Sequence, residues 1–270
     1  MTIYKALTIA GSDSGGGAGI QADLKTFQEL GVFGMTAITA VTAQNTMGVQ
    51  GVYPIPVEGI VQQMESIGTD LIPNAFKTGM LFNSEIIEAV AELIKKYNWH
   101  NLVVDPVMIA KGGASLLKQQ AIDALKQFLL PLAKVVTPNI PEAEVLTGIK
   151  IESIEDRKKA AMELHRLGAQ YVMIKGGHED NSEIMTDLLY DGEGFREYKS
   201  KKVHTKNTHG TGCTFSAAIT AHIAKGESVP VAIHYAKDFI QAAIEEDLHL
   251  GQGHGPTNHW AYNNRGAIKL

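Results

Sequence analysis

The regular alternation of apolar strands with amphipathic helices limits the fold of this sequence more than any other feature. Strands that alternate with helices of about ten or more residues form βαβ units, which give a mostly parallel sheet covered by helices on both faces. The first two thirds of the chain follow this pattern, with strands predicted at 5–10, 35–42, 49–53, 75–78, 101–104, 134–136 and 171–174 and helices at 20–30, 57–67, 84–97, 118–130, 141–146 and 153–167.

The remaining third predicts a hairpin followed by two helices. Apolar runs at 185–190 and 195–199 flank Asp191-Gly192, a dipeptide that favours a tight turn between paired strands. Helical spacing follows at 214–224 and 229–244. Because no low-complexity linker and no internal repeat interrupts the chain, we expect residues 1–270 to form a single domain.

The composition argues against several classes of function. A net charge of -5 and a pI near 6.1 provide no basic surface for a nucleic acid. No apolar run reaches the length of a membrane span, and the first residues lack the pattern of a signal peptide. The single cysteine excludes an internal disulfide and suits a reducing compartment. We therefore expect a cytoplasmic protein with neither a nucleic acid nor a membrane as partner.

Polar or glycine-containing motifs follow directly on most predicted strands. Sheets of this class bind ligands outside the carboxyl ends of their strands. We therefore expect one shared cleft, formed by Gly11-Ser12-Asp13, Ala43-Gln44-Asn45, Gly79-Met80, Asp105-Pro106-Val107-Met108, Thr137-Pro138-Asn139 and Lys175-Gly176-Gly177.

A separate glycine turn, with Gly210, Thr211 and Gly212, stands directly before the helix predicted at 214–224. Glycines let the backbone approach a ligand closely, and the first N–H groups of a helix have no partner within the helix. The helix dipole at this end favours negative charge. The turn therefore predicts an anion site suited to a phosphoryl group.

Cys213, in the first turn of this helix, has two interpretations. A lone cysteine is usually a small packing residue. Beside a helix N-terminus, however, we expect its pKa to fall from about 8.5 towards neutrality. A thiolate next to a phosphate site could accept the proton of an attacking hydroxyl group.

The glycine loop over 11–19 indicates either close contact between backbone and ligand or only a flexible connection. It is not a Walker-type phosphate loop, because no glycine in the chain is followed by lysine, and it is a poor match to the dinucleotide-binding pattern. Asp23, one turn into the next predicted helix, either complements the helix dipole or binds an amine or hydroxyl group of a substrate.

Two further strand-end residues carry open alternatives. The amide of Gln44 offers a donor and an acceptor, which suit the edge of a nitrogen heterocycle, although polar residues are common in loops. Asp105 could hold Mg²⁺ through water, as phosphoryl-transfer sites require, or belong to an ordinary Asp-Pro turn.

The segment from Asn139 to Glu142 is explained structurally as a helix start. Asn139 suits the N-cap, Pro141 the first turn, and Glu142 the position that completes a capping box. Glu142 could in addition face a metal-bound nucleotide. Lys175 closes an apolar strand ahead of two glycines, so its side chain could reach phosphate oxygens.

Taken together, these motifs resemble the hydroxymethylpyrimidine/phosphomethylpyrimidine kinases of thiamine biosynthesis. The resemblance runs from about Ala6 to about His259, and the ordered set is very specific. The motifs are Ala6-Leu7-Thr8-Ile9-Ala10-Gly11-Ser12-Asp13 with Gly16-Gly17-Ala18-Gly19-Ile20-Gln21-Ala22-Asp23-Leu24-Lys25, Thr42-Ala43-Gln44-Asn45-Thr46, Lys77-Thr78-Gly79-Met80-Leu81, Asp105-Pro106-Val107-Met108, Thr137-Pro138-Asn139 with Glu142, Lys175-Gly176-Gly177-His178 and Asn207-Thr208-His209-Gly210-Thr211-Gly212-Cys213.

The resemblance implies a ribokinase-like three-layer α/β/α sandwich, usually a homodimer, that uses ATP and Mg²⁺. The implied reaction is phosphorylation of 4-amino-5-hydroxymethyl-2-methylpyrimidine, and then of its monophosphate to the diphosphate. In that family the position of Cys213 is the catalytic base, and the turn matching Gly210, Thr211 and Gly212 is the anion hole. The resemblance also assigns the substrate to Gln44, Asp23, Gly11, Ala18, Met80 and Val107, and the nucleotide and metal side to Asn139, Glu142, Lys175 and Thr208. We expect ATP to be bound by Lys175, Asn139, Thr208 and Gly177, and the metal by Glu142 and, from its strand-end position, Asp105.

Two alternative functions stay open. A close branch of the family phosphorylates pyridoxal and carries a second cysteine in the segment matching 108–112, where this chain has Ala110. The single cysteine therefore favours the pyrimidine without excluding activity on pyridoxine or pyridoxal. The other alternative is a non-catalytic pyrimidine-binding regulator, which an intact Cys213 and an open glycine turn disfavour.

Overall fold

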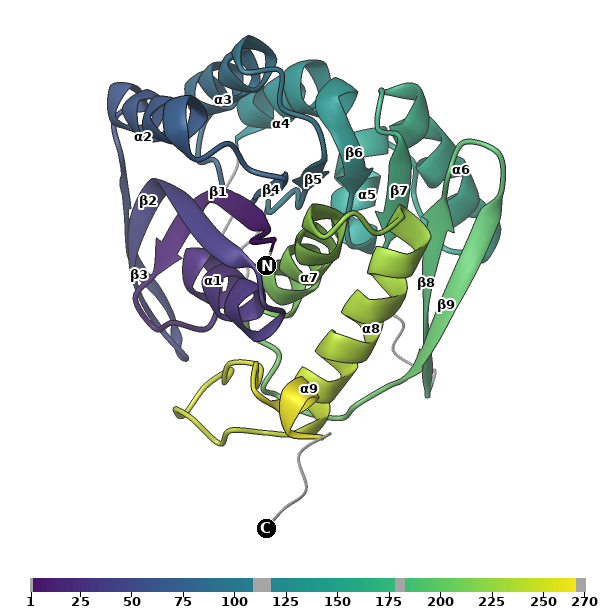
Figure 1. Cartoon of the computed structure of the whole chain (residues 1–270). Coiled ribbons are helices and arrows are strands. Elements are labelled where there is room, and N and C mark those ends of the chain that lie inside the picture. The colour runs from purple at the N-terminus through teal and green to yellow at the C-terminus, as the bar shows by residue number, and fades with distance from the viewer. Residues whose placement is uncertain (1, 109–117, 178–182, 266–270) are drawn as a thin grey trace.

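Parallel strands with the carboxyl ends at one edge form the centre of the protein. In the computed structural model, which describes residues 2–108, 118–177 and 183–265, the sheet has nine strands in the order β3-β2-β1-β4-β5-β6-β7-β8-β9 (Figure 1). Strands β2, β1, β4, β5, β6 and β7 run parallel, and β3, β8 and β9 pair antiparallel at the two sides. The strands are β1 Lys5–Asp13, β2 Phe33–Asn45, β3 Gly48–Pro54, β4 Ala75–Thr78, β5 Leu102–Val104, β6 Ala133–Val136, β7 Tyr171–Ile174, β8 Ile184–Tyr190 and β9 Phe195–Lys201.

Helices cover both faces of this sheet, which confirms the predicted layers. Figure 1 shows α1, α7 and α8 on one face and α2 to α6 on the other. The helices are α1 Gly19–Glu29, α2 Val57–Asp70, α3 Ser84–Lys96, α4 Gln119–Ala124, α5 Ile140–Thr147, α6 Ile154–Arg166, α7 Thr211–Ala224, α8 Val229–Glu245 and α9 Ala261–Asn264.

Successive residues of the central strands enter two separate cores, because side chains alternate between the faces of a strand. On β4, Phe76 packs with the α2–α6 layer and Ala75 with the α1, α7 and α8 layer. On β7, Val172 likewise packs with the α2–α6 layer and Met173 with the α1, α7 and α8 layer. Near-continuous apolar strands such as these are typical of a parallel sheet covered on both faces.

Helix α7 is buried on all sides from Thr214 to Ala224. A helix without a polar face belongs inside a core rather than on a surface. It packs against α1, α8 and strand β4, so its N-terminal turn is held firmly near the carboxyl ends of the parallel strands.

Several element boundaries differ from the prediction by a few residues; for example, α2 runs on to Asp70 and α7 already begins at Thr211. Strands β1 and β2 run on to Asp13 and Asn45, because β1 keeps pairing with β2 beyond a bulge near Gly11 and β2 pairs with β3. The helix predicted at 118–130 is regular only to Ala124; it continues as a π-helical turn over Leu125–Leu129 and a 3₁₀ turn over Leu130–Leu132, which contains Pro131. Among the described residues, no helix is long and apolar enough to cross a membrane.

Candidate active site

One cavity of about 680 Å³ lies at the carboxyl ends of the parallel strands. At least one residue of each of the six strand-end motifs lines it, which confirms the shared cleft, although Ala43, Asn45, Pro106, Met108, Thr137, Pro138 and Gly176 do not. Every residue that was given an individual role also lines the cavity. These residues are Gly11, Ala18, Asp23, Gln44, Met80, Asp105, Val107, Asn139, Glu142, Lys175, Gly177, Thr208, Gly210, Thr211, Gly212 and Cys213.

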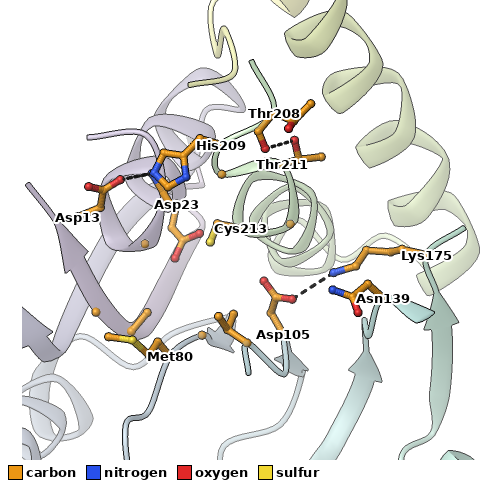
Figure 2. Close-up of a pocket in the computed structure, with 18 of the residues that line it drawn as sticks. Asp13, Asp23, Met80, Asp105, Asn139, Lys175, Thr208, His209, Thr211 and Cys213 are labelled. Carbon is orange, nitrogen blue, oxygen red and sulfur yellow. Dashed lines mark hydrogen bonds and ion pairs between the residues drawn. The ribbon is translucent and has the colours of Figure 1, made fainter. Parts of the chain in front are cut away.

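The order of the strands sorts these residues along the cavity. Gln44 lies on β2 and Met80 follows β4, whereas Asn139 and Lys175 follow β6 and β7. Asp105 follows β5, between the two groups. Figure 2 shows Cys213 and Asp105 between Met80 on one side and Lys175 with Asn139 on the other. The cavity therefore has two ends and a centre, as a reaction between two substrates requires.

The glycine turn and the glycine loop are packed against each other at this centre. Gly210 is the N-cap of α7 and has a φ of 82°, a conformation that favours glycine. A Cβ atom at Gly210 would collide with the carbonyl oxygen of Gly17. The close approach explains why glycines occur in both segments, which are far apart in the sequence.

The first turn of α7 offers N–H groups to the cavity. The Thr211 N–H is directed to the Thr208 carbonyl oxygen at 3.3 Å, and the Thr211 hydroxyl donates to the same oxygen at 2.8 Å (Figure 2). The Gly212 and Cys213 N–H groups have no carbonyl partner within the helix. Both groups lie beside the cavity and suit an anion, and the anion hole at this turn stays a prediction.

A buried ion pair lies behind this turn. Lys77 Nζ is 2.7 Å from Asp23 Oδ1, and both side chains are fully buried. Thr8 donates to Asp23 Oδ2 at 2.6 Å, and Lys77 Nζ is 3.4 Å from the Cys213 carbonyl oxygen. Asp23 therefore does not act as a first-turn acid on a surface, which was one interpretation of the sequence.

The predicted lowering of the Cys213 pKa is wrong for this structure. Burial raises the pKa of the thiol to about 12; the positive charge of Lys77 opposes the shift, and Asp23 and Asp105 add to it. A hydrogen bond from Gly19 also favours the thiolate. Burial of the thiol away from water therefore raises its pKa more than the helix N-terminus lowers it. Only the effect of the helix N-terminus could be seen in the sequence.

Lys175 and Asp105 form a second ion pair at the centre of the cavity. Lys175 Nζ lies 3.3 Å from Asp105 Oδ1, and Ser216 Oγ donates to Asp105 Oδ2 at 3.2 Å. Burial works against the charge of Lys175, but Asp105 and Glu142 outweigh it and raise its pKa. A Cβ atom at Gly212 would lie 3.5 Å from Lys175 Nζ, so this cation and the start of α7 face the same space.

Glu142 completes the predicted helix start and also lines the cavity. It completes the capping box of α5, in which the Asn139 N–H donates to Glu142 Oε2 and the Glu142 N–H to Asn139 Oδ1, each at 2.8 Å. It also lines the cavity, and burial raises its pKa to about 7, with Asp105 adding to the shift and Lys175 opposing it.

The sequence analysis gave no individual role to several lining residues. Lys77 stood in a predicted strand and in a quoted motif, although a lysine within a buried apolar strand was a usable signal. Asp13 was expected only as part of the cleft, and His209 only stood inside a quoted motif. The hairpin side contributes Met185, Lys202, Val203 and Thr205, which no sequence pattern indicated. Two positions that the sequence singled out, Ala110 and His178, lie outside the described residues.

The chain is similar to known kinases over almost its whole length. Residues 13–258 match the family described as phosphomethylpyrimidine kinase. A hydroxymethylpyrimidine/phosphomethylpyrimidine kinase of Bacillus subtilis (strain 168) is 58% identical over 262 residues, which are 97% of each chain. A pyridoxine kinase of the same strain is 49% identical over 264 residues, again 97% of each chain.

The fold also occurs in a solved structure. The structure of the pyridoxal kinase from Staphylococcus aureus in complex with ADP matches this fold with a TM-score of 0.91 and 43% sequence identity. The match covers 97% of this chain and 96% of that one. The predicted ribokinase-like α/β/α fold is thereby confirmed.

We expect the thiol of Cys213, the only cysteine, to react slowly with alkylating reagents. With a pKa of about 12, its thiolate fraction at neutral pH is roughly a thousandfold below that of a free thiol. Iodoacetamide should therefore modify the folded protein far more slowly than the same chain unfolded in urea, and the rate should still rise above about pH 9. A plateau near pH 8.5 or below would contradict the raised pKa.

Proposed function

Because this chain belongs to the phosphomethylpyrimidine kinase family, we propose that it transfers the γ-phosphoryl group of ATP to the hydroxymethyl group of 4-amino-5-hydroxymethyl-2-methylpyrimidine. The monophosphate is phosphorylated in turn to the diphosphate, a step of thiamine biosynthesis. The observation that carries the proposal is the convergence of the α7 N-terminus, Cys213 and the Lys175–Asp105 pair in one cavity.

The pyrimidine occupies the β2 end of the cavity in this proposal. Gln44 pairs with the polar edge of the ring, and Met80 and Val107 supply apolar contacts. Gly11 and Ala18 leave room for the ring, since neither has a bulky side chain. The hydroxymethyl group then faces Cys213, with Asp23 close behind it.

The nucleotide occupies the opposite end. Lys175 offsets the charge of the phosphate chain, and the Gly212 and Cys213 N–H groups stabilise the oxygens of the transferring group. Asn139, Thr208 and Gly177 line the path of the phosphates and sugar. Phosphoryl transfer depends mainly on such positioning and electrostatic stabilisation.

Asp105 and Glu142 fit a Mg²⁺ ion that is shared with the phosphates. The described residues contain no group of three or more acidic, histidine or cysteine side chains that would enclose a metal. Mg²⁺ commonly takes only one or two carboxylates and completes its coordination with water and phosphate oxygens. The two carboxylates interact electrostatically and share one cation, Lys175, so a further positive charge is favourable here. When bound, Mg²⁺ would neutralise charge on the phosphates.

Cys213 is the proposed acceptor of the hydroxymethyl proton. Its raised pKa means that the thiolate is rare at neutral pH, so the base contributes more as the pH rises. Lys77 supplies a neighbouring positive charge when the thiolate forms. Its ammonium group is buried and held by Asp23, so it cannot turn away into water.

We also propose that residues 1–270 act as one kinase domain in the cytoplasm and that the enzyme is a homodimer. Exposed apolar side chains on the outer part of the sheet support an interface. Val41 on β2 is 42% exposed, and Tyr53 on β3 is 65% exposed.

A substrate panel tests the proposed reaction. We expect ADP release with the pyrimidine to exceed that with pyridoxine or pyridoxal at saturating ATP, and to vanish when a chelator removes Mg²⁺. A clear preference for pyridoxal would favour the alternative that the chain is a pyridoxine or pyridoxal kinase. Binding of the pyrimidine without any ADP release would favour the regulator alternative.

Replacement of the thiol tests the role of Cys213. Wild-type turnover should rise with pH between about 7.5 and 9, because the small fraction of thiolate grows about tenfold per pH unit below the raised pKa. We expect Cys213→Ala to lower turnover by about two orders of magnitude or more, to flatten this pH profile and to keep pyrimidine binding. Cys213→Ser, which preserves the shape of the side chain, serves as the packing control. Wild-type turnover in both variants would reduce Cys213 to a packing residue.

A further inference from the structure

A chain of polar side chains lies at the β2 end of the cavity. His209 Nε2 is 2.8 Å from Asp13 Oδ2 and 3.2 Å from Gln44 Nε2. Gln44 Oε1 is 3.1 Å from Thr42 Oγ1. Asp13 is 3% exposed and His209 is 8% exposed, and both line the cavity with Gln44. Figure 2 shows the ring of His209 directed at Asp13.

Asp13 determines which atom of His209 carries a proton. Asp13 Oδ1 accepts the Gly15 N–H at 2.8 Å, and Oδ2 accepts the N–H groups of Gly17 at 3.0 Å and Ala18 at 2.8 Å. Burial alone would raise the pKa of Asp13, but hydrogen bonds from His209 and the backbone outweigh it and lower the pKa. An ionised carboxylate can only accept hydrogen bonds, so His209 Nε2 must donate.

The protonated Nε2 atom in turn selects one orientation of the Gln44 amide. With Gln44 Nε2 towards His209, two donors would face each other. A half-turn about the Cγ–Cδ bond exchanges nitrogen and oxygen, which have nearly the same shape, and removes this contact between donors. The His209 N–H donates mainly to Asp13 at 2.8 Å, and the Gln44 oxygen then shares the same proton as a second, weaker acceptor at 3.2 Å.

Thr42 favours the same half-turn independently. Its hydroxyl donates to the Ser12 carbonyl oxygen at 2.9 Å and has only one proton. It can therefore accept from the Gln44 amide nitrogen but cannot also donate to the amide oxygen. Both neighbours of Gln44 thus require the oxygen towards His209 and the nitrogen towards Thr42.

The His209 ring is held firmly in this place. Its backbone N–H donates to the Gly255 carbonyl oxygen at 3.0 Å, and its carbonyl accepts the Thr257 N–H at 3.3 Å. A Cβ atom at Gly17 would lie only 2.6 Å from His209 Cδ2, so glycine at this position lets the ring reach Asp13 and Gln44.

We propose that Asp13 and His209 are positioning residues that fix the direction of the Gln44 amide and so select substrates with an amino group beside a ring nitrogen. The inference rests on the proposed function, because it takes the pyrimidine as the occupant of this end. The fixed amide keeps one N–H and one oxygen lone pair. An aminopyrimidine edge needs the oxygen opposite its amino group and the N–H opposite its ring nitrogen, whereas a reversed amide would oppose donor to donor. Pyridoxal and pyridoxine have a ring nitrogen but no such amino group, so they can use only the N–H half of this edge.

The selectivity of position 209 variants tests the proposal. For His209→Phe, we expect the ratio of kcat/KM for the pyrimidine to kcat/KM for pyridoxal to fall about tenfold, the scale of one lost hydrogen bond. The loss should fall on the KM of the pyrimidine more than on kcat. His209→Gln, which restores an N–H donor, should recover part of the ratio. His234→Phe, the same replacement at a residue whose side chain is 66% exposed on α8, is the matched control and should leave the ratio unchanged.

A double variant separates positioning from general distortion. In a Gln44→Ala background, His209→Phe should have no further effect on the ratio, since the amide that it directs is gone. An unchanged ratio in His209→Phe, or an equal fall in both backgrounds, would overturn the proposal. Wild-type turnover of the pyrimidine reports separately on the proposed function. If that turnover is absent, the ratio of the two binding affinities, measured by calorimetry on the same variants, still decides the role of His209.

Discussion

The buried ion pair between Asp23 and Lys77 is the interaction on which the site depends. It joins α1 to β4 with both side chains fully buried, and Lys77 also approaches the Cys213 carbonyl oxygen at the start of α7. Removal of one partner from a buried pair leaves an uncompensated charge, which costs about 3–5 kcal/mol. The pair therefore ties three elements together at one point. It also places a fixed positive charge beside the thiol and a fixed negative charge behind it.

Around this point, the order of the strands separates most of the residues proposed for the two substrates. Gly11 and Gln44 lie on β1 and β2 and Met80 follows β4, whereas Asn139 and Lys175 follow β6 and β7. Val107 follows β5, near the middle of the sheet, and Thr208 precedes α7. The all-buried helix α7 brings its N–H groups to the middle. The residues of the site thus lie on strands and helices or within a few residues of their ends, which suits a reaction that depends on positioning.

The sequence predicted the layers and the shared cleft because both follow from periodicity and from the parallel direction of the strands. It could not predict the electrostatics of Cys213, since burial and the charges of Lys77 and Asp105 come from segments distant in the chain. The helix N-terminus was local and visible, and its effect was overestimated. Lys77 and the contact of His209 with Asp13 were hidden for the same reason: single polar residues acquire a role only from their partners in space. The capping box at Asn139 and Glu142, in contrast, is entirely local and was predicted in full.

The central claim is that one cavity presents the pyrimidine hydroxyl to a phosphoryl group at the start of α7. A crystal structure of the chain with the pyrimidine, Mg²⁺ and a non-hydrolysable ATP analogue tests this most directly. We expect the ring edge on the Gln44 amide, the hydroxymethyl oxygen within hydrogen-bond reach of Cys213 Sγ, and the terminal phosphate on the Gly212 and Cys213 N–H groups. A hydroxymethyl group directed away from Cys213, or a terminal phosphate bound away from the α7 N-terminus, would contradict the account.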